Sequence, residues 1–588
     1  MKKIFPIVLT IFLAVSTLFA EGKWTKVEMT NFKLVGSASE KELRNVGNKL
    51  EQFRQTLSLI MPKAKLESSV PTIVYVFDSY DDFQSYFQYA KNERKIAGIF
   101  ISTAEANYIN LSIEKRNYDV FDVIFHEYFH YVLRQTLVRV PLWLHEGMAE
   151  YYSTFDIDES GTKTKIGIPV ARRIAELRNR NFMPLDKLFA VTGRSPEYRE
   201  SDKVGIFYAQ SWALVHFLMN GNNGVREKQF YNFIDLVTSG TAPNIAFQRS
   251  FKADYKQIED ELRNYINRFT FPVYEIDLPK KVSWDESAKV NLLSEAETKI
   301  LQGNLLRYTG TSERAEKKLL EALNANPESA EVYRLLGAVY DAQKKRSEAR
   351  RNYEKVLALE PNNYLNYYNL VKFLREDKNY DEAIKYCQQA IKLNPNEARV
   401  YVALGAIYEN IFKDEEATQS YRQALKLNPR YGINYFNLAK IAFRNNKNDV
   451  ASAAAKATIE LDAWINNNSV KAALIVYFVA QKENKSEQAA EFLKLGLEKV
   501  DPKNFYHSVF RYLNKEINEN ELLSMAKDIN DQTISNAYIA LNLLLQGKKN
   551  EAQTKFQWIK ESGNRDFTEY GYAVKELERL EIVKQTVN

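Results

Sequence analysis

The sequence predicts two kinds of structure in series: an α+β domain in the first half of the chain and an all-α solenoid of helical repeats in the second. Short β-branched and aromatic runs alternate with helical stretches up to about residue 270. Between residues 327 and 429, a proline recurs every 34 residues. With 588 residues the chain is also too long for one hydrophobic core, since domains usually hold about 100–200 residues.

The first twenty residues have the parts of a secretory signal peptide. Lys2 and Lys3 form a positive start, an apolar stretch runs from Ile4 to Val15, and small residues lead to Ala20. The alternative is an uncleaved membrane anchor, although the apolar part is short for a span of about 20 residues. We expect residues 1–20 to be removed, no later transmembrane span, and a mature protein that is periplasmic in a bacterial envelope or secreted.

Residues 21–270 are expected to form the α+β domain. Three runs, at 71–77, 96–102 and 107–113, have the composition or alternation of strands. Helical stretches follow them at 120–138, 142–152, 204–219 and 225–238. A small sheet beside a helical body is typical of an α+β domain.

Residues 271–287 are predicted to be a linker, because they contain two prolines and a pair of lysines. Beyond them, Pro327, Pro361, Pro395 and Pro429 lie 34 residues apart, and tyrosine, leucine and alanine positions recur with the same period. This pattern resembles the tetratricopeptide repeat, a pair of antiparallel helices. We expect such repeats over 288–465, with four clear units, and degenerate helical repeats over 466–588.

The single cysteine, Cys387, excludes an intramolecular disulfide and occupies an inward-facing repeat position, so we expect it to be buried. The net charge of +6 is weak for this length and comes with no basic run. Nucleic acid is therefore not an expected partner.

The motif that indicates chemistry is His126-Glu127-x-x-His130. Residues four apart share one face of a helix, so both imidazoles can reach one metal ion. Glu127 lies next to the first ligand and can act on a water molecule at the metal without being a ligand. The alternative is a pair of core histidines on an amphipathic helix. Against it, three of the five histidines in the chain, His126, His130 and His145, lie within twenty residues.

A second segment follows, Trp143-Leu-His145-Glu146-Gly147-Met-Ala-Glu150. The two motifs, in this order and spacing, resemble the gluzincin zinc metallopeptidases over residues of about 70–220. The resemblance implies Zn²⁺ as cofactor, His126 and His130 as ligands, and Glu146 as the third ligand. Glu150 lies one helical turn after Glu146, and the resemblance implies that its carboxylate orients His126. The alternative is that Glu150 is itself the third ligand. His145 is expected to form a wall of the pocket or to contact substrate.

By the same resemblance, Glu127 is the general base and a tyrosine or histidine stabilises the oxyanion. Tyr208 is our candidate for that donor, and Tyr151, Tyr152 and His216 are rivals. The resemblance also suggests that the strand at 107–113 lies at the edge of the sheet and pairs with an extended substrate.

These expectations give two hypotheses of function. The first is an exported zinc peptidase that cleaves a peptide or protein substrate, with repeats that bind the substrate or a partner protein. The second is a non-catalytic envelope scaffold whose repeats bind other proteins and whose metallopeptidase fold is retained for stability. We favour the first, because all the motif residues are present together. The sequence shows neither the substrate nor whether the action is endo- or exopeptidase.

Overall fold

The fold is described from a computed structural model that places residues 24–587. Within this range the following residues are not described: 63, 69, 88–97, 104–105, 115–119, 138–139, 180–181, 193–194, 200, 240, 242, 283–287, 310, 430–431, 463 and 465–466. The predicted signal peptide, residues 1–20, lies outside the described residues. In the part of the chain that is described, no helix combines the length and the apolar character needed to cross a membrane.

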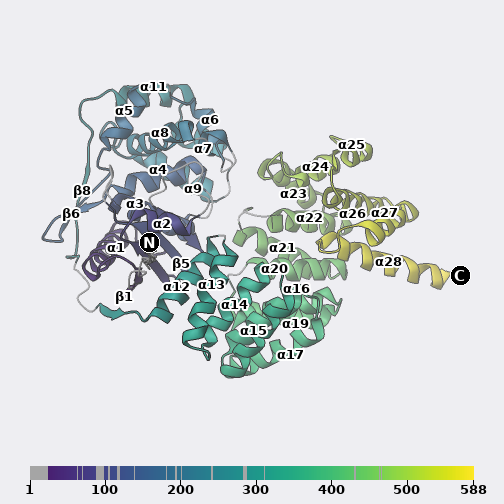
Figure 1. The fold of residues 1–588 in the computed structure, drawn as a ribbon. Coiled ribbons are helices and arrows are strands. Elements are labelled where there is room, and N and C mark those ends of the chain that lie inside the picture. Colours follow the sequence, from purple (N-terminus) through teal and green to yellow (C-terminus); the bar gives the residue numbers. More distant parts are fainter. Residues whose placement is uncertain are drawn as a thin grey trace, which may run out of the picture.

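The first domain is built on a six-stranded mixed sheet in the order β4-β5-β3-β2-β1-β9 (Figure 1). Its strands are β1 (Thr25–Glu28), β2 (Phe32–Gly36), β3 (Thr72–Phe77), β4 (Gly98–Ser102), β5 (Asn107–Ser112) and β9 (Lys289–Leu292). Strands β2, β3 and β5 pair in parallel, whereas β4, β1 and β9 each run antiparallel to their neighbours. The predicted strand at 107–113 is thus present, but it is not an edge strand, because the run before it folds back as β4 and covers its outer side.

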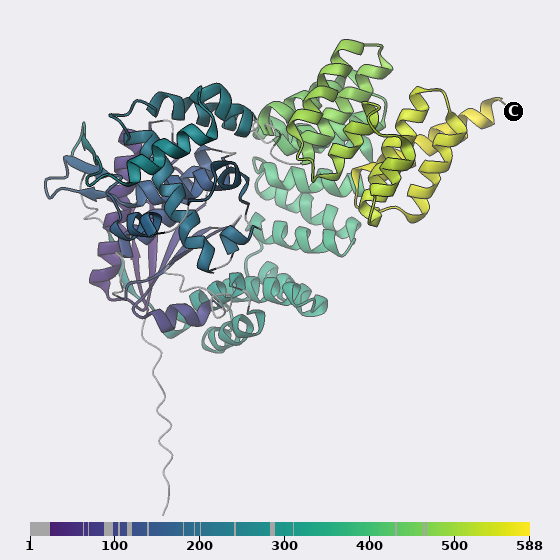
Figure 2. The same ribbon diagram turned by 90° about the horizontal axis from the view of Figure 1, so that it is seen from above.

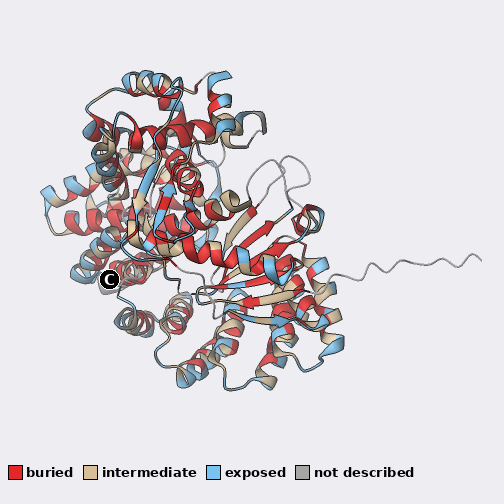
Figure 3. Ribbon diagram, turned by 90° about the vertical axis from the view of Figure 1, so that its left-hand side faces the viewer, coloured by how far each residue is buried: buried red, intermediate tan, exposed pale blue. Residues whose placement is uncertain are grey.

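Both faces of this sheet carry buried side chains, above all along β3 and β5 (Figure 3). Alternate residues of a strand point to opposite faces, and along β3 this places Val74 and Val76 in one core and Tyr75 and Phe77 in another. The first core is covered by α1 (Glu40–Ile60) and α3 (Val120–Thr136). The second is covered by α2 (Tyr80–Tyr86) and by the first helices of the repeats.

A helical layer follows α3 along the chain. Its helices are α4 (Leu142–Ser153), α5 (Ala171–Asn179), α6 (Leu185–Ala190), α7 (Pro196–Arg199), α8 (Ser201–Asn220), α9 (Glu227–Thr238), α10 (Pro243–Phe251) and α11 (Tyr255–Ile266). A second, three-stranded sheet consists of β6 (Asp156–Ile157), β7 (Lys163–Ile166) and β8 (Tyr274–Asp277). The mixture of sheet and helices agrees with the predicted α+β content.

The segment predicted as a linker takes part in the fold. Residues 274–277 form β8, which pairs with β7, and residues 289–292, which we assigned to the repeats, form the edge strand β9 beside β1. Prolines and lysines indicated a flexible connection, but the strand runs on either side of residues 283–287 are too short and too polar to stand out from the sequence.

Antiparallel helix pairs make up the second half of the chain, as the period predicts. The pairs are α12 (Glu295–Tyr308) with α13 (Ser312–Ala325), α14 (Ala330–Ala342) with α15 (Arg346–Leu359), α16 (Tyr364–Glu376) with α17 (Tyr380–Leu393), α18 (Ala398–Asn410) with α19 (Asp414–Leu427), and α20 (Gly432–Arg444) with α21 (Asn448–Asp462). This is one pair more than the four units expected, because the fifth lacks the terminal proline by which the units were counted. From α14 to α20 the first helices begin 34 residues apart.

Further helices extend the array: α22 (Asn467–Lys482), α23 (Ser486–Lys499), α24 (Phe505–Leu513), α25 (Glu519–Met525), α26 (Ile529–Leu545), α27 (Lys549–Ser562) and α28 (Thr568–Val587). Figure 2 shows the helices stacked in chain order, from α12 beside the sheet to α28 at the far end. Cys387 lies in this array and is fully buried, as its repeat position predicts.

Candidate metal centre

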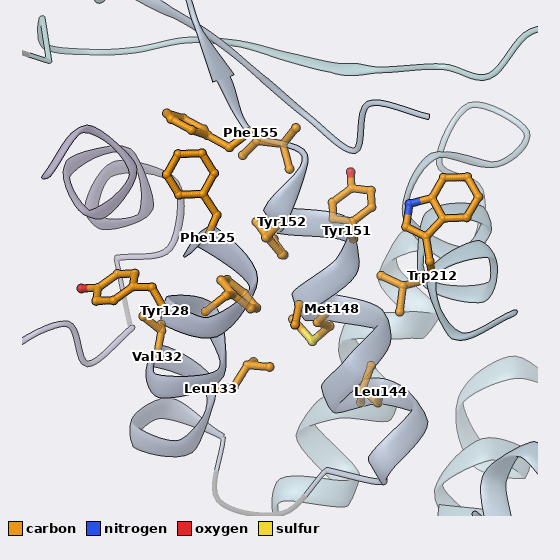
Figure 4. Packing of buried hydrophobic residues seen from close by; sticks show 14 of the residues in the cluster. Phe125, Tyr128, Val132, Leu133, Leu144, Met148, Tyr151, Tyr152, Phe155 and Trp212 are labelled. Atoms are coloured by element: carbon orange, nitrogen blue, oxygen red, sulfur yellow. The ribbon is translucent and has the colours of Figure 1, made fainter. Parts of the chain in front are cut away.

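The centre lies between α3 and α4, which are held together by apolar side chains. Figure 4 shows Leu133 of α3 pointing toward Met148 of α4. Phe129 of α3 stacks on Tyr152 of α4 with ring centroids 4.4 Å apart. The polar residues of the two motifs occupy the remaining face of each helix, so this packing brings them together.

His126, His130 and Glu146 offer three ligand atoms within 4.8 Å of one another. Glu146 Oε2 lies 3.5 Å from His126 Nε2 and 3.2 Å from His130 Nε2. Atoms that bind one tetrahedral zinc ion at about 2.0–2.1 Å lie about 3.4 Å from each other, so the two distances from Glu146 Oε2 fit such an ion. Glu146 Oε2 is also buried without a hydrogen-bond partner, which a cation would satisfy.

The three side chains are accessible to different degrees. His126 and His130 are 15 % and 12 % exposed, whereas Glu146 is 4 % exposed. Burial raises the pKa of the Glu146 carboxyl, but the adjacent imidazoles of His126 and His130 outweigh this effect and hold the pKa well below its usual value. Glu146 is therefore an anion at neutral pH, as a ligand to a cation must be.

Glu127 points from the same helix toward β4. Burial raises its pKa, while the neighbouring histidines oppose the shift, and a backbone hydrogen bond from Phe100 also lowers it. A carboxylate with a raised pKa is a stronger base than an exposed one. Glu127 is not among the three ligand atoms that converge.

Glu150 lies beside the other ring nitrogen of His126, Nδ1, opposite the side that faces Glu146. Its Oε1 is 3.8 Å from His126 Nδ1, which is longer than a hydrogen bond. Arg173 Nε donates to Glu150 Oε2 at 3.2 Å, and a second guanidinium nitrogen contacts Oε1. Glu150 thus faces the outer nitrogen of His126, and Arg173 fixes its position.

Tyr208 of α8 lies at the border of the centre. Its ring centroid is 6.3 Å from that of His126, and the Arg173 guanidinium lies over its ring at 5.7 Å. Burial and the negative charge of Glu146 raise the pKa of Tyr208 well above its usual value, so its hydroxyl keeps its proton. Tyr208 can therefore act as a hydrogen-bond donor.

The three rivals of Tyr208 have other partners. Tyr151 donates to Asn220 Oδ1 at 3.1 Å, and Tyr152 stacks on Phe129. His216 is fully buried, with Nδ1 2.8 Å from the Tyr265 hydroxyl and Nε2 2.9 Å from the Gly167 carbonyl.

His145 stacks on His130, with ring centroids 4.4 Å apart and nearly parallel planes. Burial lowers the pKa of His145 to about 3, so the ring is neutral and forms part of the wall of the centre. It is not one of the three residues whose ligand atoms converge.

Two residues of the centre had no signal in the sequence. Tyr198, on the four-residue helix α7, donates a hydrogen bond to Glu146 Oε1 at 3.0 Å, and Arg173, on α5, holds Glu150. Neither belongs to a motif or to a periodic pattern, and both are brought to the centre by the folding of the segment between α4 and α8.

Family models match two parts of the chain. A model described as a protein of unknown function (DUF1570) matches residues 123–241, which include every residue of the centre. Two models described as tetratricopeptide repeat match residues 342–407 and 398–431. The C-terminal region contains tetratricopeptide repeats. These repeats are a common scaffold for protein–protein binding, so they imply a protein partner.

Among solved structures, three matches show the extent of the likeness. PilF of Pseudomonas aeruginosa is 23% identical, with a TM-score of 0.32, over 37% of this chain and 97% of that one. PilW, a type IV pilus biogenesis factor, is 14% identical, with a TM-score of 0.32, over 37% and 98%. YrrB, described as a TPR protein with an unusual peptide-binding site, is 18% identical, with a TM-score of 0.29, over 34% and 98%. A comparison with curated proteins finds no match.

Proposed function

We propose that the chain is an exported zinc metallopeptidase of the gluzincin type, with Zn²⁺ held by His126, His130 and Glu146. The observation that supports this most directly is the convergence of their three ligand atoms around Glu146 Oε2, a buried oxygen without a hydrogen-bond partner. Export rests on the signal-like residues 1–20.

A bound zinc ion would supply a Lewis acid that lowers the pKa of water and polarises a carbonyl. Glu127 accepts the proton of the attacking water and delivers it to the departing amine. Tyr208 donates a hydrogen bond to the oxygen on which negative charge develops. Tyr198 and Arg173 keep the carboxylates of Glu146 and Glu150 in place.

The substitution Glu127→Gln tests this proposal, with Glu159→Gln as the matched control because Glu159 is exposed on a turn. We expect Glu127→Gln to lower the hydrolysis of fluorescein-labelled β-casein by at least about 10³-fold, since it removes the general base. Zinc content, measured by metal analysis, should stay near one per chain in all three proteins.

The proposal fails if Glu127→Gln hydrolyses casein as fast as the wild type, or if the wild type binds no zinc. The alternative is a non-catalytic scaffold whose repeats bind other proteins. One observation favours it, the length of the repeat array. The scaffold role predicts that Glu127→Gln supports every cellular function of the wild-type protein, whereas the peptidase proposal predicts that it does not.

A further inference from the structure

A groove of about 1000 Å³ lies between the sheet and the inner side of the repeats. Ser102 at the end of β4 and Asn107 at the start of β5 line one wall. The opposite wall comes from α14, α16 and α18, at repeat positions 34 residues apart: Glu331, Leu365 and Arg399. Both halves of the chain therefore build the groove, and neither half contains it alone.

Carboxamide side chains are frequent in its lining, among them Asn107, Asn304, Asn363, Asn366 and Asn369. Each can both donate and accept hydrogen bonds, which are the two capacities of a peptide backbone. Asn366 and Asn107 are buried and already oriented: Asn366 Nδ2 donates to the Glu360 carbonyl at 3.2 Å, and Asn107 Nδ2 donates to Ser68 Oγ at 3.0 Å.

The charged residues of the lining balance one another: Glu331, Glu360 and Glu397 against Arg334, Lys372 and Arg399. Arg399 forms two hydrogen bonds with the carboxylate of Glu397, both at 2.9 Å. A groove with no excess of positive charge does not suit nucleic acid, whose binding depends on contacts with phosphates. Its polar, neutral surface suits a polypeptide segment of mixed sequence.

The groove begins where β4 ends. β4 is the last strand in the sheet order, and the N–H of Phe100 points away from β5, at the carboxylate of Glu127. Ser102, two residues farther on, lines the groove. Two residues of a strand cover about 7 Å, so a polypeptide that runs along the outer side of β4 past Glu127 reaches the groove within a few residues.

We propose that this groove binds an extended polypeptide that continues from the β4 edge, so that the repeats hold part of the same substrate molecule that the metal centre cleaves. This inference rests on the proposed function. It makes the inner side of α14–α18 a part of the substrate site and not a separate adaptor surface.

The test uses the full-length protein with the double substitution Asn369→Ala and Lys372→Ala, which changes the groove wall on α16. The matched control is Gln389→Ala with Lys385→Ala, a carboxamide and a lysine exposed on α17 and outside the groove. Binding of fluorescein-labelled β-casein, an unfolded chain, is measured by anisotropy in a Glu127→Gln background, and hydrolysis is measured without that change. A quenched tripeptide serves as the short substrate.

We expect the groove variant to weaken casein binding about tenfold, as the loss of one or two hydrogen bonds implies, and to raise KM for casein by a similar factor. Hydrolysis of the tripeptide should stay at the wild-type rate, because a peptide bound by its scissile bond at the metal centre is then too short to extend into the groove.

Equal casein binding and equal KM in the groove variant and its control would overturn the inference and leave the peptidase proposal intact. The inference would also be overturned if the groove variant lost as much activity on the short peptide as on casein. A wild type that hydrolyses neither substrate would instead refute the peptidase, and a loss of casein binding in the groove variant would then still support the groove as a polypeptide site.

Discussion

Arg173 and Tyr198 are the two residues that hold the carboxylates of the centre, and neither lies in a motif. His126, Glu127 and His130 were selected from the sequence because two metal ligands and a base need that spacing on one helix, and Glu146 was selected by the resemblance to the gluzincins. Tyr198 and Arg173 could not be selected, because a single tyrosine or arginine in a loop-rich segment has no period or partner in the sequence. Their places depend on how α5 and α7 pack against α4.

Arg173→Met is expected to weaken zinc binding by about 10–100-fold, the usual effect of removing a partner of a residue next to a metal ligand. Glu150 would lose both hydrogen bonds from the guanidinium and would no longer be fixed beside His126. Competition with a zinc chelator measures the change, and Arg172→Met is the control, since Arg172 is exposed. Equal affinities in the two variants would show that Arg173 has no such role.

At the scale of the elements, α4 and α8 lie close together at Gly147, directly after the expected ligand Glu146. A Cβ at this position would lie 2.4 Å from the Ser211 carbonyl oxygen and 2.8 Å from Val215 Cγ2. The Glu-Gly step of the motif is therefore explained by packing as well as by chemistry: the small residue lets α8, which carries Tyr208, lie against α4.

Gly147→Ala should lower the free energy of unfolding by about 1–3 kcal/mol, because α4 and α8 must separate to make room. Gly205→Ala is the control, since the nearest atoms to its new methyl group belong to the carboxylate of the flexible Glu176 side chain. Urea denaturation followed by circular dichroism gives both values, and a Gly147→Ala protein as stable as the control would contradict the packing argument.

The elements differ in how far the sequence could predict them. The repeats could be predicted because the same residue pattern returns every 34 residues. Gly337 and Gly405, for example, lie where the two helices of a pair cross, each against the ring of a tyrosine. The order of the strands in the sheet could not be predicted, because strand pairing joins segments far apart in the sequence, such as β1 and β9. The edge was therefore assigned to β5 and not to β4.

At the scale of the whole molecule, the sheet and the repeats share one core. Tyr75 and Phe77 of β3 pack with Leu305 and Leu319 of the first repeat pair, and the Tyr75 hydroxyl donates to the Leu301 carbonyl at 3.2 Å. The predicted boundary near residue 288 thus divides a continuous set of contacts.

A chain that ends at residue 287 should consequently be insoluble or partly unfolded, because the loss of β9 and α12–α14 exposes the Tyr75 face of the sheet. A chain that ends at residue 360 keeps this core and should remain folded and bind zinc. Solubility, circular dichroism and zinc content of the two truncated proteins check the expectation. A soluble, zinc-binding protein that ends at residue 287 would contradict it.

Arrays of helical repeats need a cover at each end, since a terminal unit would otherwise leave its apolar side in water. Here the outer face of a β-sheet takes that position at the beginning of the array, in contact with α12 and α13. Transplanting the repeats onto another protein would thus remove their N-terminal cap, and unwinding of the array should then start at α12.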